Sequence, residues 1–451
     1  MKSIRKFCAI IVGKIISFFA ILIGNGSGAA APGLVALKIY PELITDLCKN
    51  IEKKKIIISA TNGKTTTATM VRAILENNCD SYISNQTGSN LARGIASSLI
   101  KSSNLIGEFK IDYGVFEVDE AVLPYMIKQI KPDIVVLGNV FRDQLDRYGE
   151  IDAILAKWQK ALKSAKPETQ LLLNGDDPGI AGLRNGLKLE TFFYGIDAKI
   201  EKDEIILDHA ADSINCPICS KELQYKSQQF SHLGNYQCNF CGFKRPKIDL
   251  LAKDIDEKLN QTQFDVDHDK YEITLGGIYN VYNALAAIGV ARLLDISYSV
   301  VNNSFKNVKP AFGRMEEFQI DGQKYKIILI KNPTGANAVI NILRKMNNKN
   351  ILIALNDRIA DGTDVSWIYD TDWEKIGDVK QIVCMGTRRY DMAIRLKYAH
   401  IEIGKIKTAV NYLSQIASMK NKDDYVYILP TYTAMLEIRS QLEKKKIVEK
   451  I

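Results

Sequence analysis

The chain has 451 residues, of which 46% are hydrophobic, and this length and composition allow about three globular domains with substantial cores. Its 60 Lys and Arg outnumber its 52 Asp and Glu, and the net charge of +8 suits an anionic substrate or a membrane surface without by itself indicating nucleic acid. Eight cysteines are too dilute for a secreted disulfide framework, and the four histidines form no recognisable catalytic arrangement. We therefore expect a reducing compartment and exclude both a disulfide scaffold and histidine-based nucleophilic catalysis within this chain.

Residues 8–24 form an apolar segment that follows Lys2, Arg5 and Lys6, a pattern shared by signal peptides and membrane spans. Lys14 interrupts the segment and leaves an uninterrupted run of about ten residues, whereas a spanning helix needs about 20. We expect an apolar helix that packs on the protein or rests on the face of a membrane. A true span or anchor is the alternative.

A β-branched run at residues 56–58 leads into Ala60-Thr-Asn-Gly-Lys-Thr-Thr66 and then into a segment with apolar residues at helical spacing. In such a phosphate loop Gly63 lets backbone N–H groups approach phosphate, Lys64 supplies a cation, and the Thr65 hydroxyl can ligate Mg²⁺. The common G-x-x-x-x-G-K-[ST] spacing is not satisfied, because Ile58 stands five positions before Gly63. A chance Gly-Lys-Thr in a structural turn is therefore the alternative at this point.

Three further apolar runs follow, and each ends in polar residues. Residues 113–121 carry Glu117, Asp119 and Glu120 at their end, and residues 132–140 and 170–178 also run into polar turns. Ligands bind at the carboxyl ends of strands in open α/β sheets, and carboxylates there can hold Mg²⁺. The pattern predicts a parallel nucleotide-binding sheet with a magnesium site near Glu117.

Two C-x-x-C pairs, Cys216/Cys219 and Cys238/Cys241, are separated by eighteen residues. This spacing is typical of a tetrahedral four-thiolate zinc site on two knuckle turns, and such a closed site is structural. A zinc ribbon that binds nucleic acid is the alternative, which we disfavour because the basic patch is small and stacking aromatics are few. The other cysteines lie in apolar surroundings and are expected to be buried and unreactive: Cys8, Cys48, Cys79 and Cys384.

In the C-terminal third, apolar runs alternate with helical patterns again and predict a second doubly wound domain. The expected strands lie at residues 326–330, 350–355, 381–385 and 424–429, with a helix at 336–346. Residues 356–370 follow one of these strands and contain four aspartates and a tryptophan. The aspartates either cap the next helix and solvate a loop, or they form a functional site.

Taken in chain order, these motifs resemble those of the Mur ligases. The resemblance rests on residues 60–66, Glu117, residues 139–149, 174–178 and 277–287, and Gly313-Arg314. There are two departures from the family pattern. Ala60 replaces a glycine common before Thr-x-Gly-Lys-Thr, and Gln144 stands where many Mur ligases have a histidine. A glutamine has no acid or base function, so only a hydrogen-bonding role is left at that position.

The resemblance implies an α/β fold with a Mur ligase-like central domain and a Rossmann-like C-terminal domain. We expect an N-terminal apolar segment at residues 1–50 and an ATP-binding domain with a parallel sheet at 51–312. The zinc ribbon would be inserted at about 212–247, and the C-terminal ligase domain would occupy 313–451. The implied cofactors are ATP, Mg²⁺ and structural Zn²⁺. The residues implied to bind ATP and Mg²⁺ are Asn62, Gly63, Lys64, Thr65, Thr66, Glu117, Asn283 and Arg314.

Within the Mur ligases, the ribbon, the Arg142–Arg147 segment and the aspartate loop resemble the ligase-like subunits of lipid II isoglutaminyl synthase. That likeness implies ATP-dependent amidation of the α-carboxyl of D-isoglutamate in lipid II, at the cytoplasmic face of the plasma membrane. It also implies a heterodimer with a GatD-type glutaminase, whose catalytic triad Asp364 would complete, with Asp361 the neighbour to test next. An amino-acid-adding Mur or folate-type ligase would use the same nucleotide site and is the main rival.

Overall fold

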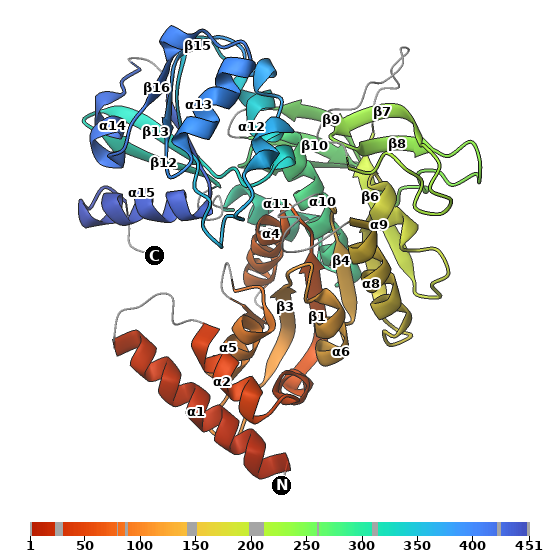
Figure 1. Cartoon of the computed structure of the whole chain (residues 1–451). Helices are drawn as coiled ribbons and strands as arrows, with labels where there is room; N and C mark the ends of the chain where they lie inside the picture. Colours follow the sequence, from red (N-terminus) through yellow and green to blue (C-terminus); the bar gives the residue numbers. More distant parts are fainter. Residues whose placement is uncertain are drawn as a thin grey trace.

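The computed structural model describes residues 2–22, 30–78, 80–85, 89–141, 151–197, 212–258, 261–308, 314–421 and 425–448. Figure 1 shows a layer of N-terminal helices at one end, a central part built on a large sheet, and a C-terminal part built on a second sheet. The C-terminal part sits beside the end of the central part that is remote from the N-terminal helices (Figure 1).

Three α-helices lie in the described residues of the N-terminal part: α1 (Lys2–Leu22), α2 (Ala31–Ile39) and α3 (Leu43–Leu47). Helix α1 packs against α2 and against α5 (Ala92–Ser102) of the central part. Its inner face includes Ala9 and Ile10, which are fully buried, and Gly13, where a Cβ would lie 2.9 Å from the Ile100 side chain. The expected apolar helix thus packs on the protein, and no helix in the described part of the chain is long and apolar enough to cross a membrane.

The central sheet has nine strands among the described residues, in the order β11-β10-β9-β6-β5-β4-β1-β3-β2. Neighbouring strands from β2 to β9 in this order are parallel, whereas β10 runs antiparallel to both β9 and β11. The strands are β1 (Ile51–Ser59), β2 (Tyr82–Ser84), β3 (Ile111–Glu117), β4 (Ile134–Leu137), β5 (Gln170–Asn174), β6 (Thr191–Ile196), β9 (Leu250–Glu257), β10 (Thr262–Val266) and β11 (Asp269–Ile273). The expected parallel sheet is confirmed, with an antiparallel edge that the sequence analysis did not predict.

Helices cover both faces of this sheet because its strands are apolar on both sides. On β1, Ile56 and Ile58 point into one core and Ile57 into the other. The first core is closed by α4 (Lys64–Asn77), α10 (Ile278–Leu293) and α11 (Tyr298–Lys306). The second is closed by the N-terminal helices with α5, α6 (Leu123–Ile130), α8 (Ile151–Lys163) and α9 (Pro178–Gly182).

The C-terminal sheet has the order β12-β13-β17-β14-β15-β16, with β12 antiparallel to β13 and the other pairs parallel. Its strands are β12 (Arg314–Ile320), β13 (Gln323–Ile328), β14 (Lys349–Ala354), β15 (Val379–Met385), β16 (Ile406–Thr408) and β17 (Val426–Pro430). Its helices are α12 (Pro333–Leu343), α13 (Arg389–Tyr398), α14 (Tyr412–Ser418) and α15 (Tyr432–Lys444), with short 3₁₀ turns at Ser366–Tyr369, Trp373–Lys375 and Ile403–Lys405. The second doubly wound unit is therefore confirmed, although Asp424, which begins the expected last strand, lies outside the described residues.

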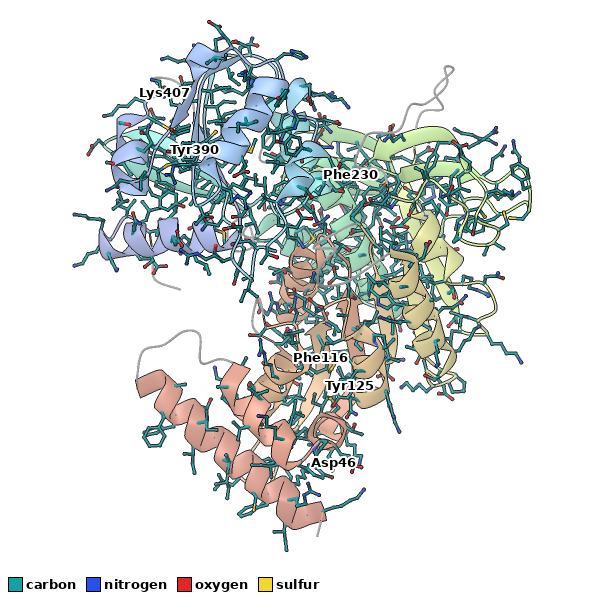
Figure 2. All side chains as sticks on the ribbon, viewed as in Figure 1. Asp46, Phe116, Tyr125, Phe230, Tyr390 and Lys407 are labelled. Atoms are coloured by element: carbon teal, nitrogen blue, oxygen red, sulfur yellow. The ribbon has the colours of Figure 1, made fainter. Side chains whose placement is uncertain are left out.

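A two-stranded hairpin, β7 (Gln224–Phe230) and β8 (Leu233–Gln237), lies between the two cysteine pairs. It projects from the carboxyl-end side of the central sheet near β6 and α9 (Figure 1). Figure 2 places Phe230, at the end of β7, where this hairpin approaches the C-terminal part of the molecule.

Candidate functional site

The loop between β1 and α4 has the geometry of a phosphate-binding loop. Gly63 adopts φ +90°, and a Cβ at this position would lie 2.0 Å from Oδ1 of Asn283, so only glycine fits. No side chain caps the N-terminus of α4, so its first N–H groups remain available to an anion. The predicted strand–loop–helix context is present.

Lys64 lies almost buried beneath this loop. Its Nζ donates to the carbonyl oxygen of Ala60 at 3.0 Å and pairs with Glu120 Oε2 at 3.2 Å. The two residues are 7% and 5% exposed. Burial favours the neutral form of the Glu120 carboxyl, but the charges of Lys64 and Lys331 outweigh it and hold the pKa of Glu120 below its usual value. The phosphate-binding cation is therefore held in place by a buried carboxylate.

Thr65 and Glu117 lie side by side, as a magnesium site requires. The Thr65 hydroxyl donates to Glu117 Oε1 at 2.9 Å. The amide of Asn85 exchanges two 2.9 Å hydrogen bonds with the backbone of Glu117, which fixes the end of β3. A hydroxyl and a carboxylate oxygen are donors that suit a hard cation such as Mg²⁺.

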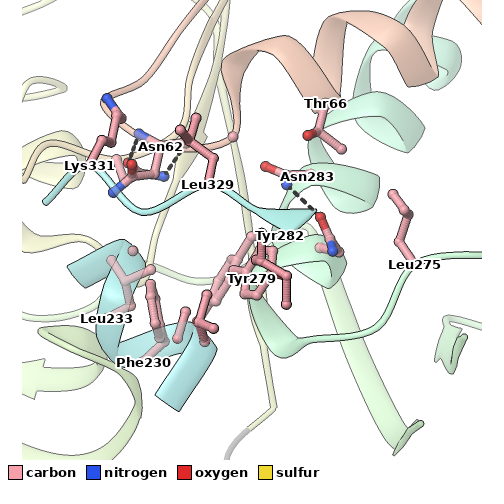
Figure 3. A pocket seen from close by; sticks show the side chains of 17 residues that line it. Asn62, Thr66, Phe230, Leu233, Leu275, Tyr279, Tyr282, Asn283, Leu329 and Lys331 are labelled. Carbon is pink, nitrogen blue, oxygen red and sulfur yellow. Dashed lines mark hydrogen bonds between the residues drawn. The ribbon is translucent and has the colours of Figure 1, made fainter. Parts of the chain in front are cut away.

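A cavity opens between the phosphate loop and the C-terminal part (Figure 3). Residues from both parts line it: Asn62, Gly63, Thr66, Asn139, Phe230, Leu233, Leu275, Tyr279, Asn280, Tyr282, Asn283, Ile328, Leu329, Lys331, Gly335, Ala338 and Val339. Of the predicted residues, Asn62, Gly63, Thr66 and Asn283 are in this lining, whereas Lys64, Thr65 and Glu117 are not. Asn283 accepts from the Thr67 hydroxyl at 3.3 Å and donates to Asn280 at 3.1 Å, which positions it over the loop.

Several lining residues were not predicted from the sequence. Lys331 follows β13, and its Nζ donates to the carbonyl oxygen of Thr61 at 3.2 Å. The Asn332 amide beside it donates to Asn62 Oδ1 at 3.3 Å. The C-terminal part thus reaches the phosphate loop directly, and the only hint in the sequence was a Lys-Asn-Pro after an apolar run.

The aromatic end of the cavity comes from a different part of the chain. Phe230 of the hairpin lies 6.0 Å from Phe141 and 6.4 Å from Tyr279, measured between ring centroids. Leu233 lies beside Phe230 and extends an apolar wall at this end, whereas Leu275 lies on the opposite side of the cavity, near Thr66 (Figure 3). Such a wall suits a flat aromatic base, while the loop at the other end suits phosphates.

Two sequence-level predictions fall outside what the structure describes. Arg314 begins β12, but its side chain is not among the described ones, so its proposed nucleotide contact stays a prediction. Residues 142–150, which include Gln144, also lie outside the described part of the chain.

The four predicted zinc ligands are brought together. The Sγ atoms of Cys216, Cys219, Cys238 and Cys241 all lie within 4.8 Å of one another, and Cys216–Cys241 and Cys219–Cys238 are each separated by 3.5 Å. Four thiolates about 2.3 Å from a tetrahedral zinc ion would be about 3.8 Å apart, so the cluster fits Zn²⁺. The backbone N–H of Cys241 lowers the pKa of Cys238 to about 7, whereas burial raises the pKa of Cys216 to about 12.

A buried aspartate joins the ribbon to the nucleotide-binding sheet. Asp176, which follows β5, accepts from Arg245 Nε at 2.6 Å and from the Tyr282 hydroxyl at 2.8 Å. Burial raises the pKa of Asp176 despite the adjacent guanidinium. Because Arg245 follows the second cysteine pair and Tyr282 lies on α10, this network fixes the ribbon relative to the cavity wall.

Two of the four aspartates in the C-terminal loop, Asp361 and Asp364, have different environments. Asp361 is buried, accepting from the backbone N–H of Thr433 at 2.7 Å and from its hydroxyl. Asp364 is exposed, and its carboxylate accepts a 2.8 Å bond from the Ser366 N–H. That bond lowers the pKa of Asp364, so it presents an ionised carboxylate to solvent. Asp361 shapes the loop, whereas Asp364 is accessible to a partner.

The expectation for the remaining cysteines holds only in part. Cys48 and Cys384 are buried, and burial raises the pKa of each thiol to about 12. Cys8 is exposed, which corrects the prediction, because its side chain lies on the side of α1 that faces solvent. Cys79 lies outside the described residues.

Comparison with known proteins assigns the class. Residues 58–239 match the Mur ligase middle domain, and residues 329–435 match the MurT ligase C-terminal domain. The fold is shared with a pseudomurein peptide ligase type C from Methanothermus fervidus, with a TM-score of 0.64, 23% identity, and coverage of 89% of this chain and 81% of that one. It is also shared with the MurF ligase from Thermotoga maritima in complex with ADP, with a TM-score of 0.61, 16% identity, and coverage of 91% and 85%. The chain thus has the Mur ligase fold.

Two relatives narrow the assignment. The chain is 35% identical to the MurT subunit of the glutamine-hydrolysing lipid II isoglutaminyl synthase of Streptococcus pneumoniae, over 94% of each chain. It is 32% identical to the corresponding Staphylococcus aureus subunit over 98% of each. The chain belongs to the MurT family of the Mur ligases.

Proposed function

We propose that this chain is the ligase subunit of a lipid II isoglutaminyl synthase. It would amidate the α-carboxyl of D-isoglutamate in the lipid II stem peptide to D-isoglutamine, using ATP and ammonia from a GatD-type glutaminase. The observation that carries the proposal is the 35% identity to a subunit of that name over 94% of both chains. The complete phosphate loop supports it, because activation of a carboxylate needs a nucleotide site.

The proposed chemistry has two steps. A carboxylate oxygen attacks the γ-phosphorus of ATP, ADP leaves, and an acyl phosphate forms. Ammonia then attacks the acyl carbon, phosphate leaves with the C–O bond electrons, and the proton lost from nitrogen passes to solvent. Activation is needed because a free carboxylate is a poor acyl donor.

The residues of the loop would share the charge that develops on the transferred phosphoryl group. Lys64 and the N–H groups at the start of α4 would stabilise it, and Lys331 would add a second cation from the C-terminal part. Thr65 and Glu117 would hold Mg²⁺, which would neutralise phosphate oxygens. The apolar wall around Phe230 would contact the adenine, with Asn283 at the loop.

Asp364 would act on the partner rather than on the ligase reaction. An exposed, ionised carboxylate can orient a histidine that another chain supplies, as the third member of a triad does. Exposed apolar side chains near it, including Ile359 and Tyr369, would lie in the contact with the glutaminase. The four-cysteine site would hold a structural zinc ion.

The test is an amidation assay with ATP, lipid II and either ammonium or glutamine, with and without a GatD-type subunit. We expect ammonium to support amidation by the chain alone and glutamine to require the partner. An amino-acid-adding ligase would instead extend the stem peptide and would leave the α-carboxyl free. Absence of amidation under all four conditions would refute the proposal.

A further inference from the structure

Helix α1 presents large apolar side chains on the side that faces solvent. Its small and buried residues Ala9, Ile10 and Gly13 face the protein. The opposite face carries side chains at positions 4, 7, 8, 11, 15, 18 and 19, which recur at the three- and four-residue spacing of one helical stripe. We call this stripe the outer face of α1; its members are Ile4, Phe7, Cys8, Ile11, Ile15, Phe18 and Phe19.

The outer face is apolar along its whole length and is open to solvent. Ile4, Phe18 and Phe19 are 68%, 61% and 54% exposed, and Ile15 is 50% exposed. Figure 2 shows the side chains of α1 projecting from the outermost edge of the molecule. Scattered exposed apolar residues are ordinary, but a continuous stripe that contains three phenylalanines needs an explanation.

Further exposed apolar side chains adjoin the helix. Leu105 and Ile106 are 59% and 58% exposed in the loop after α5. This loop touches α1, because a Cβ at Gly107 would lie 2.6 Å from the Ile10 side chain and 2.8 Å from that of Lys6. The apolar surface is therefore broader than the helix alone.

The charges on α1 favour an anionic surface. The helix has Lys2, Arg5, Lys6 and Lys14 and no acidic residue. By helical spacing Arg5 and Lys14 border the stripe on its two sides, whereas Lys2, which pairs with Glu42 at 3.0 Å, and Lys6 lie toward the inner face. Cations beside an exposed apolar face are the signature of a helix that lies in a membrane interface.

The length and the packing of α1 argue against other arrangements in a membrane. Its 21 residues span about 31 Å, enough for a long contact in the plane of a bilayer. The Lys14 amine is bonded to the carbonyl oxygen of Ser103, which ties the middle of the helix to α5. The inner face is committed to α2 and α5, so only the outer face is available.

We propose that the outer face of α1 docks the chain on the surface of an anionic bilayer, with the helix lying in the membrane plane. The phenylalanines would enter the boundary between headgroups and acyl chains, and the flanking cations would meet anionic headgroups. Docking would bring the ligase to a lipid-linked substrate, and this purpose rests on the proposed function. The docking itself does not depend on it.

The experiment is co-sedimentation of the full chain with vesicles of phosphatidylglycerol and phosphatidylcholine, and with vesicles of phosphatidylcholine alone. We expect binding to the anionic vesicles that weakens as salt increases, because exposed charges are screened. The variant Phe18→Ser/Phe19→Ser should bind at least about tenfold more weakly, since two large apolar groups no longer enter the interface. The control variant Ile403→Ser/Val410→Ser removes apolar groups that are 66% and 75% exposed and far from α1 in sequence, and it should bind like the wild type.

Other outcomes would overturn the proposal. Equal, salt-insensitive binding to neutral vesicles would refute the role of anionic lipid. Light scattering that shows a dimer lost in Phe18→Ser/Phe19→Ser, without vesicle binding by the wild type, would show that a second copy covers this face. An amidation assay with a water-soluble lipid II analogue distinguishes the proposed ligase function from the proposed membrane docking. Vesicle binding without amidation would reject only the ligase function, and amidation without vesicle binding would reject only the docking of α1 on a membrane.

Discussion

Replacing Lys64 by methionine keeps the length of the buried side chain but removes the charge that faces Glu120. The two residues are 3.2 Å apart and almost fully buried, so the variant leaves a carboxylate with one fewer cation in a low-dielectric site. Removing one partner of a buried ion pair lowers the free energy of unfolding by about 3–5 kcal/mol. Lys331 also acts on Glu120, so we expect the lower end, about 3 kcal/mol.

The assay is thermal unfolding of the full chain, in which the transition of the central part is measured for the wild type, Lys64→Met, Glu120→Gln and the double variant. At roughly 2–4 °C per kcal/mol for a domain of this size, Lys64→Met should lower Tm by roughly 6–12 °C. The double variant should recover much of that loss, because no unpaired charge remains. The matched control is Lys101→Met on the exposed side of α5, which should leave Tm almost unchanged.

The same variants should differ in their pH dependence. In the wild type the pKa of Glu120 is below 4.5, so its contribution to stability is present above that pH and is lost as pH falls through the folded-state value. In Lys64→Met, burial becomes dominant and raises this pKa, so the ionised carboxylate destabilises the fold increasingly as pH rises above about 4.5. The Tm deficit of Lys64→Met should therefore be larger at about pH 7.5 than at about pH 5. A Tm within about 2 °C of the wild type, or a deficit independent of pH, would refute the reasoning.

Three further predictions concern the loop, the aspartates and the metal. Gly63→Ala should weaken ATP binding at least about tenfold in calorimetry, because the new Cβ would lie 2.0 Å from Asn283; unchanged affinity would show that the loop relaxes. Asp364→Asn should abolish only glutamine-dependent amidation, whereas Asp361→Asn should also lower Tm; equal behaviour of the two would contradict their different burial. Cys238→Ser should lose zinc in metal analysis, and it should bind a fluorescent ATP analogue more weakly because the ribbon hairpin lines the cavity. Unchanged binding of the analogue by the zinc-free variant would show that nucleotide binding does not depend on the ribbon.

The local parts of the site were predictable because their chemistry lies within short stretches of sequence. A β-branched run, Gly63 and the residues after it define a strand, a turn and a helix by themselves. The cysteine spacing likewise sufficed to predict a four-thiolate cluster. The apolar runs of the C-terminal third predicted four of its parallel strands but not the short parallel strand β16. The antiparallel edges alternate polar and apolar residues and were not predicted.

Partnerships between distant residues were decided only by the tertiary structure. Phe230 reaches the cavity because the buried Asp176 network fixes the ribbon against α10, and Lys331 reaches the phosphate loop because β13 ends at the same cavity. The sequence showed four aspartates in one loop, but burial against Thr433 is what distinguishes Asp361 from the exposed Asp364. By itself, the sequence determined which groups the chain has and their local geometry. Which of them meet, and which face solvent, depends on sheet order and packing, which join residues hundreds of positions apart.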